Sequence, residues 1–241
     1  MNKIDAQAKS VSDLLSNKKY TIDYYQREYK WEKEQITELM QDLEAKFLEN
    51  YEEKQVLKEK VDSIEEKFDG MPRFHLNLWS KRYIHHILAR ITAHIEEQSN
   101  MASNFSIYVS REIKKPYEIE HIWADHYEQH TDEFGTEEDF SQYRNRIGNL
   151  ILLPGDINRS INDNRYEEKL PVYSGQNVLA KSLDEQFYHN NPSFLAYKNS
   201  SGLPFRSHLA FKKADLDARQ QLYRLICEEI WSPSRFDREL V

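Results

Sequence analysis

The chain has few of the residues that cross-link a fold, anchor it in a membrane or build tight phosphate loops. Its 241 residues include one cysteine, Cys227, and six glycines. A single cysteine excludes a disulfide within the chain and a cysteine-rich zinc site. The shortage of glycine leaves little room for a glycine-rich phosphate loop. No apolar run approaches the roughly 18 residues of a membrane span, and the polar start lacks a signal-peptide pattern, so we expect a cytoplasmic protein.

The composition favours a folded protein with one main domain and an appended piece. Charged residues make up 31% and aromatic residues 12% of the chain, which suits a folded rather than a disordered protein. The length lies near the roughly 250 residues at which a single hydrophobic core stops growing. A net charge of −8 argues against broad nonspecific affinity for nucleic acid, because Lys and Arg supply most of that binding.

One histidine and its neighbours carry the candidate chemistry. His121 is the only histidine that follows a carboxylate within an apolar, strand-like run. Because an imidazole titrates near neutral pH, we interpret His121 as a general base that takes a proton from water. Glu120 and Asn158 offer oxygen ligands of the kind that Mg²⁺ or Mn²⁺ prefers. These residue types together indicate a phosphodiesterase with a single metal ion. The alternative is that His121 is a hydrogen-bonded core residue.

The segments around His121 predict a strand, a turn, a second strand and a helix. Residues 149–153 form a short apolar run that Pro154-Gly155 ends, because proline and glycine interrupt local structure. Asn158 is expected to open the helix, since asparagine is favoured at helix N-caps. Successive strand residues point to opposite faces, so Glu120 and His121 can share a site only at a strand end or a bulge.

This order of elements and residues resembles the His-Asn-His (HNH) nucleases, whose ββα unit holds one divalent cation. Asn149 and Asn158 are nine positions apart, a separation typical of the two asparagines of that family. The resemblance implies that His121 is the general base and that Glu120 and Asn158 bind the metal. It also implies that Asn149 steadies the loop and orients the histidine.

A longer stretch, from Arg73 to Trp231, resembles the C-terminal nuclease half of modification-dependent (type IV) restriction endonucleases of the GmrSD kind. The matching segments are residues 81–84, 88–91, 120–123, 143–150 and 166–171. The implied fold is mainly α with a small β hairpin, in which a ββα-metal (HNH) nuclease core is embedded in helices. The implied activity is restriction of foreign or phage DNA that carries modified bases.

The first part of the chain resembles another part of the same enzymes. Residues 22–31, Ile-Asp-Tyr-Tyr-Gln-Arg-Glu-Tyr-Lys-Trp, look like the opening of a ParB-like, NTP-using regulatory half. The Asp-Gly-Gln-Gln-Arg motif of that half is absent from the sequence. We therefore interpret residues 1–70 as a helical remnant of the regulatory half and residues 71–241 as the HNH nuclease domain. The alternative is that the aromatic residues of 22–31 pack against the next helix.

Basic residues near the motif are candidate contacts for the DNA backbone. They are Arg144, Arg146, Arg159, Arg165 and Lys169. Such side chains can line a phosphate track even on an acidic protein, because local charge decides the contact. The alternative is ordinary ion pairing with the nearby acidic residues 137–139 and 167–168.

The rest of the chain is expected to be mostly helical. Apolar stripes predict one helix over 84–95 and another from about Asp215 to Ile230. Residues 188–208, with several Asn, Pro and Gly residues, predict a loop-rich connection.

Two functions of different classes remain open. The first is a metal-dependent DNA endonuclease, and the second is a non-catalytic remnant that binds DNA or a full-length relative. An RNA-directed nuclease would use the same chemistry as the first, and the sequence has no clear base-stacking motif to decide between the two substrates. The sequence also leaves open whether the chain forms a homodimer.

Overall fold

The computed structural model describes residues 74–232 and, before them, residues 37, 41–46, 55–60, 63, 68, 70 and 71. The chain divides into two compact units, residues 1–56 and residues 57–241, and each is described by itself. In the first unit the described residues are short helical pieces. The motif at 22–31 lies outside the described residues, and the interpretation of residues 1–70 as a regulatory remnant stays a prediction.

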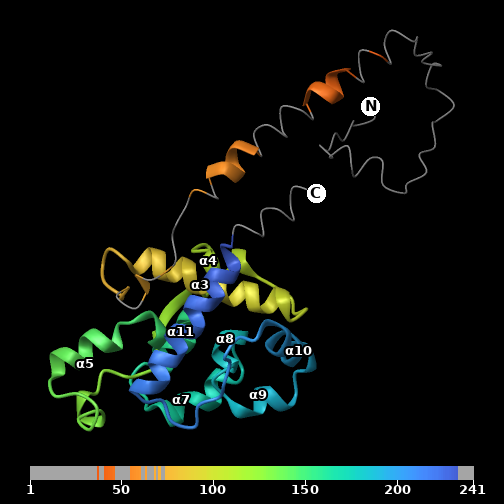
Figure 1. Cartoon of the computed structure of the whole chain (residues 1–241). Helices are drawn as coiled ribbons and strands as arrows, with labels where there is room; N and C mark the ends of the chain where they lie inside the picture. Colours follow the sequence, from red (N-terminus) through yellow and green to blue (C-terminus); the bar gives the residue numbers. More distant parts are fainter. Residues whose placement is uncertain are drawn as a thin grey trace, which may run out of the picture. The chain divides into compact units, whose positions relative to one another are not determined.

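Helices dominate the second unit, and its described residues contain one two-stranded antiparallel sheet (Figure 1). In chain order the elements are α3 (Lys81–Gln98), α4 (Phe105–Val109), β1 (Tyr117–His121), η2 (Tyr127–Gln129), α5 (Glu137–Arg144), η3 (Ile147–Asn149), β2 (Leu150–Pro154), α6 (Gly155–Ile161), α7 (Tyr166–Tyr173), α8 (Val178–Lys181), α9 (Glu185–His189), α10 (Pro192–Ser201) and α11 (Lys213–Ile230). This arrangement confirms the expected fold class, mainly α with a small β hairpin. Among the described helices, none combines the length and the apolar character that crossing a membrane requires.

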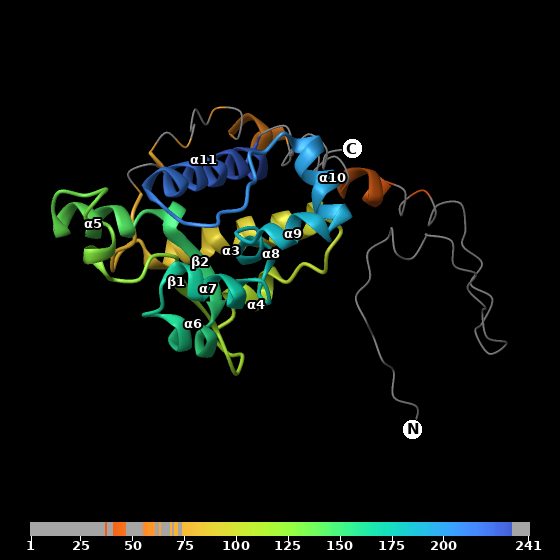
Figure 2. The ribbon, with the colours of Figure 1, turned by 90° about the horizontal axis from the view of Figure 1, so that it is seen from below.

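The two strands and the helix that follows them form a compact ββα unit. β1 and β2 pair with Glu120 opposite Ile151 and His121 opposite Leu150. α6 starts directly after β2 and packs on both strands. In Figure 2, α6 lies on one side of the strands and α11 on the other.

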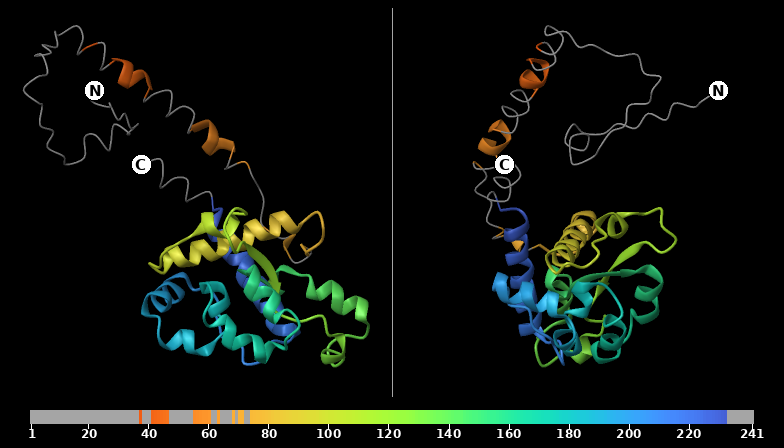
Figure 3. Two further views of the ribbon diagram at one scale, coloured as in Figure 1. Left: turned by 180° about the vertical axis from the view of Figure 1, so that it is seen from behind. Right: turned by 90° about the vertical axis from the view of Figure 1, so that its right-hand side faces the viewer.

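β2 runs through the centre of the hydrophobic core. Its residues Leu150 to Leu153 are fully buried, as expected of a continuous apolar run that is covered on both faces. α3 and α8 pack against β2, and α11 packs against η3, the turn that leads into it. α3 and α11 also contact each other, and both views of Figure 3 show them next to one another.

Both edges of this sheet are closed by side chains instead of further strands. Alternate carbonyls of each strand point outward, and five of them accept a hydrogen bond from a side chain on a surrounding helix or helix cap. The pairs, acceptor first, are Tyr117 with His85, Ile119 with Asn158, His121 with Lys169, Leu150 with Tyr223, and Leu152 with Asn177. A buried carbonyl without a partner costs about 1–3 kcal/mol, so these bonds fix each helix to the hairpin.

The structure corrects two expectations about the elements. Asn158 does not open a helix, because α6 already begins at Gly155, and Asn158 lies inside it. Residues 188–208 are not mainly loop, because they contain the ten-residue helix α10. Its proline occupies the first helical turn, where the missing N–H has no intrahelical partner to lose.

At Gly148 the backbone of α11 leaves no room for an added Cβ atom. A Cβ at this residue would lie 2.6 Å from the carbonyl oxygen of Leu216 and 2.8 Å from the backbone nitrogen of Gln220. Both atoms belong to the backbone of α11 and cannot rotate away. We expect Gly148→Ala to lower the free energy of unfolding by about 1–3 kcal/mol, the usual cost of overpacking, in urea denaturation.

The matched control is Gly175→Ala, since a Cβ there meets only the carbonyl oxygen of Val172 at an ordinary 3.6 Å. Equal losses in the two variants would mean that the close approach of Gly148 to α11 is not what restricts this position.

Candidate active site

His121 is held at the end of β1 by an asparagine. Its Nε2–H donates to Oδ1 of Asn145 at 3.0 Å, and Nδ2 of Asn145 donates in turn to the carbonyl oxygen of Ser141 at 2.9 Å. This chain of bonds fixes the amide and therefore the imidazole tautomer. The Nδ1 atom of the half-buried His121 is left as the hydrogen-bond acceptor of the ring.

The surroundings keep His121 neutral. Burial lowers the pKa of His121 to about 3, and the positive charge of Arg144 acts in the same direction. The ring is therefore neutral at pH 7, and its Nδ1 lone pair carries no proton.

Asn149 joins the segment after β1 to the end of α5. It is fully buried, its Oδ1 accepts from the backbone nitrogen of Trp123 at 3.1 Å, and its Nδ2 donates to the carbonyl oxygen of Arg144 at 2.8 Å. Asn149 thus ties the loop together, while the direct bond to His121 comes from Asn145. Nothing in the residue types or their spacing singles out Asn145, although it lies four residues before Asn149 in the same motif.

Glu120 is buried and faces α7. Its Oε1 accepts from Nζ of Lys169 at 2.7 Å and from the hydroxyl of Tyr173 at 3.0 Å. Burial raises the pKa of Glu120, and the adjacent Lys169 ammonium opposes that rise. Its second oxygen, Oε2, has no hydrogen-bond partner in the described part of the chain. One carboxylate oxygen of Glu120 can therefore still accept a bond from another group.

Asn158 lies on α6 over the backbone of β1. Its Nδ2 donates to the carbonyl oxygen of Ile119 at 3.2 Å, which turns the amide so that Oδ1 is the remaining ligand atom. Oδ1 of Asn158 and Oε2 of Glu120 are hard oxygen donors of the type that Mg²⁺ and Mn²⁺ take. The described residues contain no group of three or more His, Cys, Asp or Glu side chains arranged to hold a metal. Water and substrate oxygens would therefore complete any coordination shell here.

Two of the five basic residues that the sequence suggests as DNA contacts instead form bonds within the protein. Lys169 has no exposed surface, so it cannot reach a phosphate. The structure thus corrects the expectation that Lys169 contacts the DNA backbone. Its ammonium instead neutralises Glu120 and donates a hydrogen bond to the carbonyl oxygen of His121 at 2.7 Å. Arg144 is largely buried, and its Nε donates to the carbonyl oxygen of Trp123 at 3.2 Å. Both cations stabilise the loop around His121.

The exposed arginines differ in their partners. Arg159 forms an ion pair with Glu118, with 2.9 Å between Nη1 and Oε1. Glu118 is not one of the acidic residues 137–139 and 167–168 that the sequence suggests as partners. Arg165 is exposed at the start of α7, and within the described residues its guanidinium has no acidic partner. The charge of Arg165 is therefore not paired within the described part of the chain.

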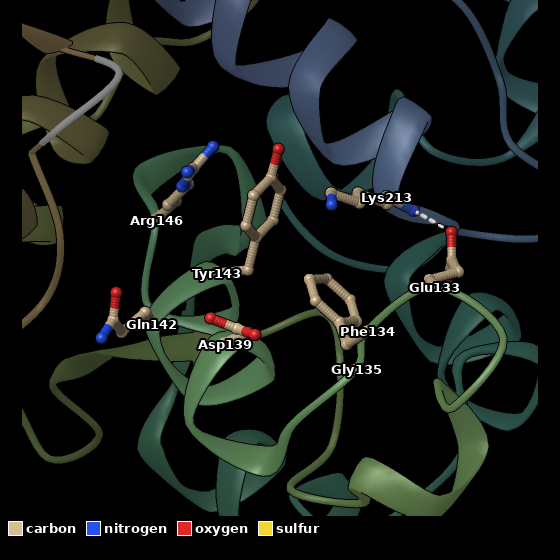
Figure 4. Close-up of a pocket in the computed structure, with 8 residues that line it drawn as sticks. All are labelled: Glu133, Phe134, Gly135, Asp139, Gln142, Tyr143, Arg146 and Lys213. Atoms are coloured by element: carbon tan, nitrogen blue, oxygen red, sulfur yellow. Dashed lines mark hydrogen bonds between the residues drawn. The ribbon is translucent and has the colours of Figure 1, made fainter.

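Arg146 lines a pocket of about 260 Å³ next to α5 (Figure 4). Its guanidinium lies 3.5 Å from the centre of the Tyr143 ring and 3.6 Å from Asp217. The ammonium of Lys213 lies 4.7 Å from the centre of the same ring, so that in Figure 4 Tyr143 stands between the two cations. The pocket therefore combines two cations and aromatic rings with the carboxylates of Glu133 and Asp139, which also line it.

The buried ion pair between Lys169 and Glu120 allows a direct test of what holds this site together. In Lys169→Met the Glu120 carboxylate would remain buried without its cation, so we expect a loss of about 3–5 kcal/mol in the free energy of unfolding, measured by urea denaturation. The double variant Lys169→Met/Glu120→Gln removes both charges and should recover much of this loss. A single variant as stable as the parent would show that the pair is not needed.

Comparison with known proteins gives one match. A family model described as GmrSD restriction endonucleases, C-terminal domain, matches residues 62–221, which is more than half of the chain. No curated protein and no solved structure matches the chain. The matched range contains β1, β2 and α6, and it also includes every candidate residue of the site. The chain belongs to the GmrSD restriction endonucleases, through their C-terminal domain.

Proposed function

We propose that the chain is an HNH-type endonuclease that hydrolyses phosphodiester bonds of DNA with the help of Mg²⁺ or Mn²⁺. The observation that carries the proposal is geometric: Asn145 fixes His121 at the end of β1 through Nε2 and leaves Nδ1 as the acceptor of the ring. Family membership supports DNA as the class of substrate. The ββα arrangement of β1, β2 and α6 supports the HNH type.

The proposed reaction uses His121 as the general base. Nδ1 takes a proton from a water molecule while the water oxygen forms a bond to phosphorus. The bond between phosphorus and the leaving oxygen breaks, and the leaving oxygen takes a proton from solvent. Asn145 holds the ring in the tautomer that this step needs, and Asn149 holds the loop from which the ring projects.

In this proposal Glu120 and Asn158 would hold a divalent cation as oxygen ligands, through Oε2 and Oδ1 respectively. When bound, the cation supplies charge neutralisation on the phosphate and on the leaving oxygen. Lys169 and Tyr173 hold the Glu120 carboxylate in place through its other oxygen, which fixes the direction of Oε2. Arg165, exposed and without an acidic partner among the described residues, is the proposed backbone contact.

The biological role that we propose is restriction in the cytoplasm of foreign or phage DNA, including DNA with modified bases. The support is the match to the restriction endonuclease family. A non-catalytic remnant, which binds DNA or a full-length relative, is the second candidate, because the sequence carries the motif at 22–31 without the companion Asp-Gly-Gln-Gln-Arg motif of the regulatory half.

The first experiment compares the parent with His121→Ala on unmodified, hydroxymethylated and glucosylated DNA and on RNA, with Mg²⁺ or Mn²⁺ and with or without NTP. We expect metal-dependent cleavage of DNA by the parent and a loss of at least about 100-fold in the variant, as for removal of a general base. The matched control, His189→Ala, changes an exposed histidine on α9 and should cleave like the parent.

Equal cleavage by His121→Ala would show that His121 only packs. No cleavage by the parent under any condition, together with no binding of Mn²⁺ in a titration, would favour the remnant. A urea unfolding curve for each variant separates lost chemistry from lost folding.

Asn145 provides a second test, as a positioning residue. Asn145→Ala removes the acceptor of the His121 Nε2–H, so we expect kcat to fall by about 10- to 100-fold, the usual effect of losing a group that orients a histidine. Mn²⁺ affinity should not change. Asn145→Asp keeps an acceptor oxygen and should retain more activity than the alanine variant. If the alanine variant has the kcat of the parent, Asn145 does not position the base.

A further inference from the structure

A turn beside the candidate active site presents two large apolar side chains to solvent. Leu78 is 94% and Trp79 is 89% exposed. Single apolar residues on a surface need no explanation, but this adjacent pair contributes almost nothing to the core. The pair therefore points to a binding role.

The turn is held rigidly by its own hydrogen bonds. Oδ1 of Asn77 accepts from the backbone nitrogens of Trp79 at 2.8 Å and of Ser80 at 2.9 Å. Oγ of Ser80 donates to the carbonyl oxygen of His75 at 2.7 Å. An asparagine that bonds its own backbone in this way fixes a tight turn. The exposure of Leu78 and Trp79 is thus set by the fold.

The same turn is joined to the support of the candidate base. The backbone nitrogen of Leu76 donates to the carbonyl oxygen of Asn145 at 2.7 Å, and His75 forms a β-bridge with Arg146. Asn145 also holds His121 through its side chain. The exposed pair and His121 are therefore attached to one short segment, which fixes the separation between them.

The charge around the turn suits a polyanion. The chain has 41 acidic residues, yet none lies between positions 71 and 95. Lys81 and Arg82 follow the turn, are exposed and form no ion pair within the described part of the chain. They occupy the first turn of α3, where the helix dipole disfavours cations. The guanidinium of Arg82 lies 5.4 Å from the centre of the Tyr83 ring, but the helix dipole gives neither cation a reason for its position. Both charges are exposed and could bind phosphates.

We propose that Leu78 and Trp79 form a wedge that enters the duplex substrate between adjacent bases, while Lys81 and Arg82 bind the flanking phosphates. The inference rests on the proposed function, because it takes DNA as the substrate. Apolar side chains inserted at a base step unstack the bases and kink the duplex, and an aromatic ring stacks on any base. The fixed link to Asn145 then sets the distance along the DNA from the wedge to the bond that is cut.

The test uses the full chain with His121→Ala to prevent cleavage and a duplex that contains 2-aminopurine, whose fluorescence rises when it is unstacked. We expect DNA binding to raise the fluorescence. Trp79→Ala should abolish the rise and weaken binding by about 5- to 100-fold, the range for losing one base–aromatic stack. The matched control is Leu209→Ala, which removes another apolar side chain that is 76% exposed and should change neither quantity.

The phosphate contacts have a separate readout. Lys81→Ala and Arg82→Ala should each reduce the slope of log affinity against log salt concentration by about one, without removing the fluorescence rise. Unchanged slopes in both variants would overturn this part of the proposal.

The remaining outcomes separate the wedge from the proposed function. If the parent cuts DNA and Trp79→Ala binds and unstacks DNA equally well, Leu78 and Trp79 do not act as a wedge. The proposal that the chain is a nuclease is then still supported. If Trp79→Ala instead converts a dimer into a monomer in sedimentation, the turn is a contact between copies of the chain and the wedge is overturned. If the parent neither binds nor cuts DNA, both proposals fail.

Discussion

The fold depends on how a sheet of only two strands can lie in a protein core. Such a sheet has two edges, and every outward backbone group on them needs a partner once water is excluded. Here side chains from several helices and a helix cap donate to five carbonyls of β1 and β2. The helices are consequently arranged around the hairpin by hydrogen bonds as well as by apolar packing.

This constraint also places the candidate chemistry. Asn158 and Lys169 close the edge of β1, so the bonds that hold α6 and α7 in place also set the surroundings of Glu120. Lys169 acts twice, because it binds the backbone of His121 and neutralises Glu120. A basic residue near a nuclease motif is therefore not automatically a DNA contact, since burial of a carboxylate creates its own need for a cation.

The charge of the chain is distributed in a way that its net value hides. The acidic total of −8 coexists with an acid-free segment that begins before α3 and carries the exposed turn at Leu78 and Trp79. Because salt limits electrostatic interactions to about 10 Å, the field near this turn depends on its own Lys81 and Arg82 more than on distant carboxylates. An acidic protein can thus present a local surface for DNA.

The sequence alone determined the local features: the apolar run of β2, the stripe of α3, the order of strand, strand and helix, and the family motif around His121. These depend on residue spacing over a few positions, which the chain carries directly. The tertiary structure decided what no local pattern encodes. It brought Asn145 to His121 across 24 residues and Lys169 to Glu120 across 49. It also left Leu78 and Trp79 outside the core. Partners so distant in the chain are chosen by packing and by the need to satisfy buried polar groups, and both arise only when the whole fold is formed.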